Sequence, residues 1–459
     1  MNRSNILLFL STAALLGVDP SAGSADRRTT TADLLTDLRS NEAVVRVAAA
    51  CALRDASVGE RESGAVAAAL EPLLADDRRV ESPADCRDEM RFGHGDWIRM
   101  TSPALEAAEA LAELGSASRS VLERGLRAPS SVVRAHSARA VGQLEEESAG
   151  ADLIRLLADP EASVRRAAIE ALGCLELRSA ESAVAARLAD DDAETRIAAA
   201  DALATIGGPA SLTALLKALG DPSARVREEV LDTLQEIGGP QATAAAVRAL
   251  TDADARVRIE AIEVLSDHGA GGDVEALGKL AADPDWRVRE AAARALGELG
   301  DARGRARLVT ALRDASWRVR VAAADSLGTL QNSEDLSALL QAVDDPHHEV
   351  RRAALGALAE IGDPRAAAVA TRVLADPDWR LREKAAETLG DLASQSAVAP
   401  LSKALSDANW HVRHAAIEGL VEIEDPGAVP ALRGLLKDPR PEVREAATEA
   451  VADLLDEEE

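Results

Sequence analysis

The sequence predicts an all-α protein, a right-handed α-solenoid of about 12–13 stacked helical hairpins with a 31-residue period. Three observations lead to this fold class. An aspartate precedes a regularly recurring arginine by six residues. Alanine and leucine dominate the apolar residues, and aromatic residues make up only 2% of the chain, a composition that favours closely packed helices. The recurring arginines stand 31 residues apart at Arg134, Arg165, Arg196, Arg227, Arg258, Arg289, Arg320, Arg351, Arg382, Arg413 and Arg444.

The first helix of each hairpin has a predicted start signal. From Arg165 onward an aspartate stands six residues before the arginine, and proline follows that aspartate in six of the ten copies. An aspartate at the N-cap accepts hydrogen bonds from free backbone N–H groups, and proline at the first helical position lacks the N–H that would go unpaired. We therefore interpret the aspartate as the N-cap and the proline as the first helical residue.

The rest of each copy completes a hairpin. In the copy around Arg289, the apolar residues fall on one stripe of a helix, and Gly300 and Asp301 end it. The stripe comprises Val288, Ala291, Ala292, Ala295, Leu296 and Leu299. A second helix fits before the next aspartate, as in residues 397–406. One hairpin cannot bury its own apolar face, but stacked copies bury a continuous core.

The motif D-P-x-x-x-V-R-x-x-A-A-x-x-L-G at this period resembles the HEAT-repeat superfamily, in particular the phycobilin-lyase-type HEAT-like repeat. The resemblance covers roughly residues 30–455. It implies a stacked-helix scaffold and says little about function, because this repeat serves many roles.

The same resemblance gives the alternative to a scaffold, an enzyme of the phycobilin-lyase or deoxyhypusine-hydroxylase type. The hydroxylase type would hold a di-iron centre through His-Glu pairs placed just after the repeat arginine. Here the His348-Glu349 dipeptide precedes Arg351, and His414 is followed by Ala415. We therefore expect no enzymatic activity and no cofactor.

The N-terminal segment has the features of an export signal. Arg3 precedes the 13-residue apolar run from Ile6 to Val18, which is too short to span a bilayer. Gly23 and Ala25 are small residues suited to cleavage before Asp26. We expect residues 1–25 to be a signal peptide, the mature chain to be periplasmic or extracellular, and no membrane insertion after the signal is removed.

The remaining chain divides by how well it follows the repeat. We expect a first HEAT-like repeat at 26–59, a degenerate second repeat at 60–115 with an inserted loop at 76–101, regular repeats at 116–455 and an acidic tail at 456–459. The loop holds Cys86, His94 and Trp97. A long loop in a compact scaffold is often functional, and the alternative is a cap over the end of the stack.

Three cysteines accompany the predicted export. Cys51 stands five residues after Arg46, at a position that is usually acidic in later repeats, so we expect its side chain to point outward. An outward Cys51 beside the loop carrying Cys86 suits a disulfide that pins the loop. We expect Cys174 to be a partly exposed free thiol.

The surface is strongly acidic, with a formal net charge of -27. Such a surface repels phosphate backbones, so we expect no nucleic-acid partner. His411 and His414 have a spacing found in metal sites, but no third ligand is evident, so we expect no metal ion. Acidic residues recur five positions after the repeat arginine, either as a solvated face or as a surface for basic or mixed-charge partners.

Tryptophan and arginine mark the candidate binding surface. Three residues before the repeat arginine, the C-terminal copies carry a tryptophan, interrupted by His348, and a basic residue usually follows it. Trp next to Arg is favoured at binding hot spots, whereas the alternative is that each ring packs over the neighbouring hairpin. We expect a monomeric, non-enzymatic scaffold that binds a protein or peptide along its inner face. The residues expected to bind are Trp286, Arg287, Trp317, Arg318, Trp379, Arg380, Trp410 and His411.

Overall fold

The computed structural model describes residues 30–56, 58–81, 100–268 and 274–456. The chain divides after Ala180 into two compact units, which are described separately. Apart from one pair of two-residue strands, every regular element of the described residues is helical. The predicted all-α fold of stacked helical hairpins is therefore confirmed.

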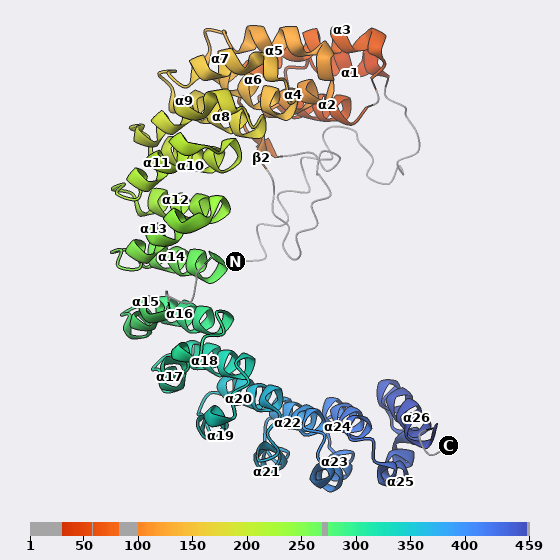
Figure 1. The fold of residues 1–459 in the computed structure, drawn as a ribbon. Coiled ribbons are helices and arrows are strands. Elements are labelled where there is room, and N and C mark those ends of the chain that lie inside the picture. Colours follow the sequence, from red (N-terminus) through yellow and green to blue (C-terminus); the bar gives the residue numbers. More distant parts are fainter. Residues whose placement is uncertain (1–29, 57, 82–99, 269–273, 457–459) are drawn as a thin grey trace, which may run out of the picture. The chain divides into compact units, whose positions relative to one another are not determined.

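The first unit stacks four helix pairs, with even-numbered helices in one layer and odd-numbered helices in the other (Figure 1). Its α-helices are α1 (Thr31–Asp37), α2 (Ala43–Asp55), α3 (Glu60–Leu70), α4 (Pro103–Glu113), α5 (Arg119–Gly125), α6 (Ser131–Gln143), α7 (Gly150–Leu156) and α8 (Ala162–Cys174). The short 3-10 turns are η3 (Glu71–Ala75), η5 (Gly115–Ala117), η6 (Glu147–Ala149) and η7 (Arg178–Ala180).

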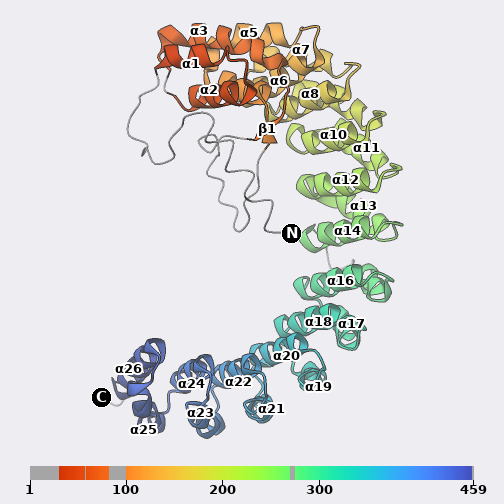
Figure 2. The same ribbon diagram turned by 180° about the vertical axis from the view of Figure 1, so that it is seen from behind.

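The second unit has the same two-layer arrangement, and its even-numbered helices pack side by side (Figure 2). The even-numbered helices are α10 (Ala193–Ile206), α12 (Ala224–Ile237), α14 (Ala255–His268), α16 (Trp286–Glu298), α18 (Trp317–Thr329), α20 (His348–Ile361), α22 (Trp379–Asp391), α24 (Trp410–Glu422) and α26 (Pro441–Asp456). The odd-numbered helices are α9 (Glu181–Ala185), α11 (Pro209–Ala218), α13 (Gly239–Ala249), α15 (Val274–Lys279), α17 (Ala302–Ala311), α19 (Leu336–Ala342), α21 (Ala366–Val373), α23 (Val398–Ala404) and α25 (Val429–Leu432). The 3-10 turns are η8 (Ala186–Ala189), η9 (Leu280–Ala282), η10 (Ser333–Asp335), η11 (Gln395–Ala397), η12 (Pro426–Ala428) and η13 (Arg433–Lys437).

The core of the second unit is one continuous apolar cluster made mostly of alanine, leucine and valine. In α16, Val288, Ala292 and Leu296 are buried, as the helical stripe predicted. Alanine at the helix contacts lets neighbouring helices approach closely, so little aromatic residue volume is needed. None of the helices in the described residues is long and apolar enough to cross a membrane.

The predicted helix start was wrong by two residues. The helix after Asp283 begins at Trp286, and its N-cap is Asp285, whose side chain accepts a hydrogen bond from the backbone N–H of Arg287. Asp283 instead lies in the turn before the helix, where its carboxylate accepts the backbone N–H of Asp285 at 2.9 Å. Pro284 is part of that turn.

The displaced aspartate belongs to an ion-pair ladder between repeats. Arg258 donates from Nε and Nη2 to the two carboxylate oxygens of Asp283, each at 2.8 Å, and both side chains are buried. Its third nitrogen, Nη1, donates to the carbonyl oxygen of Asp252 at 2.7 Å. The guanidinium therefore joins the start of its own repeat to the start of the next.

The same two-bond contact recurs with arginine and aspartate 25 residues apart and donor–acceptor distances of 2.7–3.0 Å. We call this set the Arg–Asp ladder. Besides Arg258–Asp283, it comprises Arg134–Asp159 in the first unit and Arg196–Asp221, Arg227–Asp252, Arg289–Asp314, Arg320–Asp345, Arg382–Asp407 and Arg413–Asp438 in the second.

One rung of the ladder is open. The closest approach of Arg351 to Asp376 is 4.0 Å, and Nε of Arg351 is buried without a hydrogen-bond partner. Arg351 keeps the bond from Nη1 to the carbonyl oxygen of Asp345, at 3.0 Å. The open rung can therefore be compared with the closed rungs to measure how much the two-bond contact contributes to stability.

The inserted segment leaves the first unit between η3 and α4. Strand β1 (Val80–Glu81) pairs antiparallel with β2 (Met100–Thr101), with Val80 opposite Thr101. Asp76 precedes the insertion and pairs with Arg46, whose Nε donates to Oδ2 at 3.0 Å, so a rung forms here too. His94 and Trp97 lie outside the described residues.

The cysteines differ in part from expectation. Cys51 is buried in α2, only 1% exposed, so the predicted outward orientation was wrong. The position is enclosed by neighbours such as Arg54, whose Nη2 lies 3.7 Å from its sulfur. Cys51 is disulfide-bonded, and because Cys86 lies outside the described residues, the Cys51–Cys86 pairing stays a prediction. Cys174 is an exposed free thiol, as expected.

The ladder yields a stability prediction. Arg320→Lys keeps the positive charge but replaces the planar fork by a single ammonium group, so the two-bond contact to Asp345 is lost. We expect the free energy of unfolding to fall by about 1–2 kcal/mol, since hydrogen bonds to charged groups contribute amounts of this order. Urea unfolding followed by circular dichroism measures the change.

The matched control is Arg351→Lys, at the open rung, which should cost distinctly less. If the two substitutions lower the urea midpoint equally, the two-bond contact does not stabilise the stack.

Candidate partner-binding surface

The four repeat tryptophans occupy one structural position. Trp286, Trp317, Trp379 and Trp410 are the first residues of α16, α18, α22 and α24, and His348 is the first residue of α20. These helices lie next to one another in the even-numbered layer. The slot therefore forms a line of side chains across neighbouring helices, which we call the Trp row.

The first part of the Trp row is a ring–cation–ring sandwich. The guanidinium carbon of Arg318 lies 5.0 Å from the ring centroid of Trp286 and 4.5 Å from that of Trp317. Both distances are within the range of cation–π attraction. Trp317 also stacks on His347, with ring centroids 4.1 Å apart and an interplanar angle of 7°, and His347 stacks on His348.

The second part repeats this arrangement with histidine as the middle layer. The His411 ring lies between Trp379 and Trp410, with centroid distances of 4.9 and 3.7 Å. Arg380 lies 4.8 Å from the Trp379 ring, and Arg440 lies 5.6 Å from the Trp410 ring. Arg318 and His411 thus use the same position, the second residue of the helix, to bridge two tryptophans.

The rings of the Trp row are part packing and part surface. Trp317 and Trp410 pack against the apolar core and are partly buried, and Trp379 is also half-buried. Trp286 is 36% exposed, and Arg318 and Arg380 are exposed. Both interpretations of the tryptophans therefore hold, since the rings cover the core and still present edges and faces to solvent.

Arg287 does not join the rings. Its guanidinium is bound to Asp285, with donor–acceptor distances of 3.1 and 2.6 Å, and these hydrogen bonds lower the pKa of Asp285 to about 2. Two residues that the sequence did not single out do join them. His347 and Arg440 stand immediately before their helices, where other repeats carry Asp, Ser or Asn. An imidazole or guanidinium side chain at a helix-capping position was the feature of the sequence that could have identified them.

The recurring acids lie mostly exposed on the even-numbered helices, among them Asp232 on α12, Glu263 on α14 and Glu418 on α24. Close by, burial and then the charges of Asp201 and Asp232 raise the pKa of Glu229 to about 7. Burial and then Glu263 and Asp232 raise the pKa of Glu260 likewise to about 7. Glu229 and Glu260 are thus partly buried among other carboxylates, whose charges give this face a negative potential.

The acids also line a groove of about 410 Å³ over α22, α24 and α26. Burial raises the pKa of Asp391, one of its residues. His414 contributes Nδ1, which lies 3.4 Å from Glu418. The groove thus concentrates negative charge in the repeats that carry the second half of the Trp row. Its carboxylates are Glu387, Asp391, Glu418, Glu422, Glu449 and Asp453.

The two histidines with metal-like spacing have separate partners. His411 Nδ1 lies 3.6 Å from Glu383, whereas His414 lies beside Glu418. Within the described ranges, no group of three or more His, Cys, Asp or Glu is placed to hold a metal ion.

The stacked repeats match a known family. The model of HEAT repeats matches residues 102–173, 180–266, 243–315, 274–354, 305–378 and 369–452, which together cover most of the chain. The chain belongs to the HEAT-repeat family. No curated protein sequence matches this HEAT-repeat chain closely enough to count as a relative.

Solved structures with the same fold include two karyopherins. The HEAT-repeat chain resembles Kap95p, from a structure concerning Kap95p binding to RanGDP, with a TM-score of 0.64 and 13% identity over 93% of this chain and 66% of the other. It resembles Kap121p with a TM-score of 0.61 and 15% identity over 92% of this chain and 52% of the other. The chain thus spans only about half of Kap121p, and at these identities the likeness shows the fold alone.

The acidic face of these HEAT repeats yields a pH prediction. Because the folded state raises the pKa of Glu229 and Glu260 above the ordinary value of 4.5, ionising them as pH rises through about 7 destabilises the fold. Replacing both by Gln removes that cost. The double variant should be more stable than the parent at pH 8, by about 1 kcal/mol after allowance for solvent screening.

Below pH 4.5 both carboxyls are protonated in folded and unfolded chains, so the gain should vanish. Thermal unfolding at pH 8 and pH 4 compares the two proteins. A gain of equal size at both pH values would show that charge is not its source.

Proposed function

We propose that this HEAT-repeat protein is an exported, non-enzymatic scaffold that binds a protein or peptide segment on the even-numbered helix layer of its second unit. The Trp row carries the proposal. It brings Trp286, Trp317, Trp379 and Trp410 together with Arg318 and His411 in one line of partly exposed rings. Rigid aromatic and arginine side chains dominate binding energy at protein interfaces.

The chemistry of the surface favours a partner segment with apolar and basic side chains. Partly exposed rings offer area for apolar contacts and faces for cations, as Arg318 and Arg380 already show within the chain. The acidic groove lined by Glu418 and Glu449 lies over the same helices, α22 to α26, and attracts positive charge. Acidic surroundings also discourage binding to nucleic acid.

Structural relatives support a binding role for such a stack. Kap121p has been solved bound to Pho4p and bound to Nup53p. Those partners belong to Kap121p alone, and the fold likeness is too distant to transfer them. The shared feature is a helical stack with a long face available to another chain, which is what the Trp row requires.

Export and repeat subtype are parts of the same proposal. Arg3, the apolar run of residues 6–18 and the small residues Gly23 and Ala25 support a cleaved signal, and a disulfide at Cys51 suits an oxidising compartment. The D-P-x-x-x-V-R motif supports the phycobilin-lyase-type subtype, without lyase activity.

A peptide-display selection tests partner binding. The purified chain should enrich peptides with net positive charge and apolar residues, and a synthesised winner should change the fluorescence of the row tryptophans in a Trp97→Phe background. Replacing Trp286, Trp317, Trp379 and Trp410 by Ala should weaken binding of that peptide at least tenfold, measured by calorimetry, since interface anchors each contribute about 2 kcal/mol or more.

The matched control removes exposed apolar surface elsewhere. Leu436 and Leu455 are 40% and 38% exposed and lie outside the Trp row, so replacing them by Ala should leave the affinity unchanged. Selected peptides that bind the four-Trp variant as tightly as the parent, with helicity intact by circular dichroism, would refute the proposal.

Export has a separate test. Intact mass spectrometry of protein recovered from the native envelope or medium should give a mature chain that begins at Asp26. A chain found only with residues 1–25 attached, inside the cell, would overturn the localisation while leaving the binding surface untouched.

A further inference from the structure

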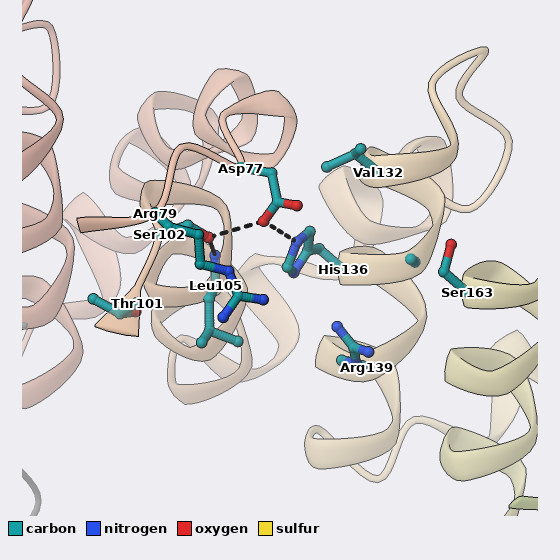
Figure 3. Close-up of a pocket in the computed structure, with 10 residues that line it drawn as sticks. Asp77, Arg79, Thr101, Ser102, Leu105, Val132, His136, Arg139 and Ser163 are labelled. Atoms are coloured by element: carbon teal, nitrogen blue, oxygen red, sulfur yellow. Dashed lines mark hydrogen bonds and ion pairs between the residues drawn. The ribbon is translucent and has the colours of Figure 1, made fainter. Parts of the chain in front are cut away.

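A second candidate site lies in the first unit, at the base of the inserted segment. A cavity of about 230 Å³ opens between β1, β2, α4, α6 and the start of α8. Figure 3 shows the side chains that line it, contributed by segments far apart in the sequence. The lining residues used below are Asp77, Arg79, Ser102, His136, Arg139 and Ser163.

Two arginines give this cavity its positive charge. Arg79 and Arg139 direct their guanidinium groups into the same space (Figure 3). Within the described residues, no hydrogen bond or ion pair engages Arg79. Arg139 has only a distant carboxylate, with Nε 3.6 Å from Glu170, and both of those side chains are more than 40% exposed. Within the described residues, neither guanidinium group at this cavity therefore has a carboxylate within hydrogen-bond distance.

The start of α8 adds to the positive potential. Ser163 is the second residue of this 13-residue helix, and the N-cap residue Glu161 makes no side-chain capping bond. The first-turn N–H groups of such a helix end carry partial positive charge and favour anions. The Ser163 hydroxyl lines the cavity and is a further donor.

The far wall holds a buried histidine. His136 is 6% exposed, and its Nε2 lies 3.6 Å from Oδ1 of Asp77, which also accepts a hydrogen bond from Ser102 at 3.2 Å. Burial, followed by the charge of Arg139, lowers the pKa of His136 against the opposing effect of Asp77. Nδ1 of His136 is buried without a partner. Asp77 thus contacts Ser102 and His136, and neither Arg79 nor Arg139 is paired with it.

We propose that this cavity binds one small oxyanion group, a phosphate or a carboxylate, between Arg79 and Arg139 with Ser163 as a further donor. Two guanidinium groups and a helix start offer several N–H donors to one group of acceptor oxygens, which is how proteins hold phosphate and carboxylate. The proposal does not depend on the partner-binding role of the second unit.

Calorimetry on the full chain at low ionic strength tests the site, with inorganic phosphate and acetate titrated separately. We expect saturable binding of at least one anion to a single site. The Arg79→Ala/Arg139→Ala variant should bind at least tenfold more weakly. Tighter phosphate binding would identify a phosphate-bearing ligand, and tighter acetate binding a carboxylate-bearing one such as a chain terminus.

The control removes the same charge from the same unit. Arg124 and Arg127 are exposed and paired with Glu71 and Asp152, so the Arg124→Ala/Arg127→Ala variant should keep the affinity. The ring proton signal of His136, assigned with His136→Gln, should shift on titration in the parent and in this control. Equal weakening in both double variants, an unshifted His136 signal, or no saturable binding of either anion would overturn the proposal.

Discussion

The Arg–Asp ladder is the interaction on which the rest of the structure depends. Each guanidinium holds the backbone carbonyl at the start of its own repeat and the carboxylate at the start of the next, as Arg258 does with Asp252 and Asp283. The same carboxylate accepts the N–H of Asp285 and so shapes the turn from which α16 begins. A buried ion pair stabilises a fold only when its hydrogen bonds are complete, and this geometry completes them. A repeat cannot shift along its neighbour without breaking these bonds.

The register of the repeats explains why the side chains of the Trp row lie beside one another. Because the closed rungs hold neighbouring repeats in register, the first and second helical residues of successive repeats line up. In the second unit those positions carry Trp286, Trp317, Trp379 and Trp410, with Arg318 and His411 layered between the rings. The constant positions of the repeat thus form the helical scaffold. The variable positions lie beside one another on its surface. The neighbouring carboxylates give the line an acidic border.

The fold was predictable because the Arg–Asp contact recurs with constant spacing, so its arginine and aspartate appear at a regular period in the sequence. The predicted helix start was wrong because Asp283 pairs with Arg258 in the preceding repeat. Rules for helix capping consider only residues close in sequence, so they do not reveal this pairing. The shared position of the tryptophans was also predictable from this period. The contacts of His347 and Arg440 with the rings were not, because they depend on side-chain orientation. Burial of Cys51 depended on packing around α2. The cavity at Arg79 and His136 could not be predicted, because an insertion without the repeat pattern brings its walls together.

A double-mutant cycle on a closed rung tests the role of the ladder most directly. Arg289→Met, Asp314→Leu and the combined variant, compared with the parent by urea unfolding, isolate the energy that the two side chains share. We predict a coupling free energy of about 2 kcal/mol or more, since removing either partner leaves a poorly satisfied, largely buried charge. A coupling near zero would contradict it, and would mean that the apolar core alone sets the register of the stack.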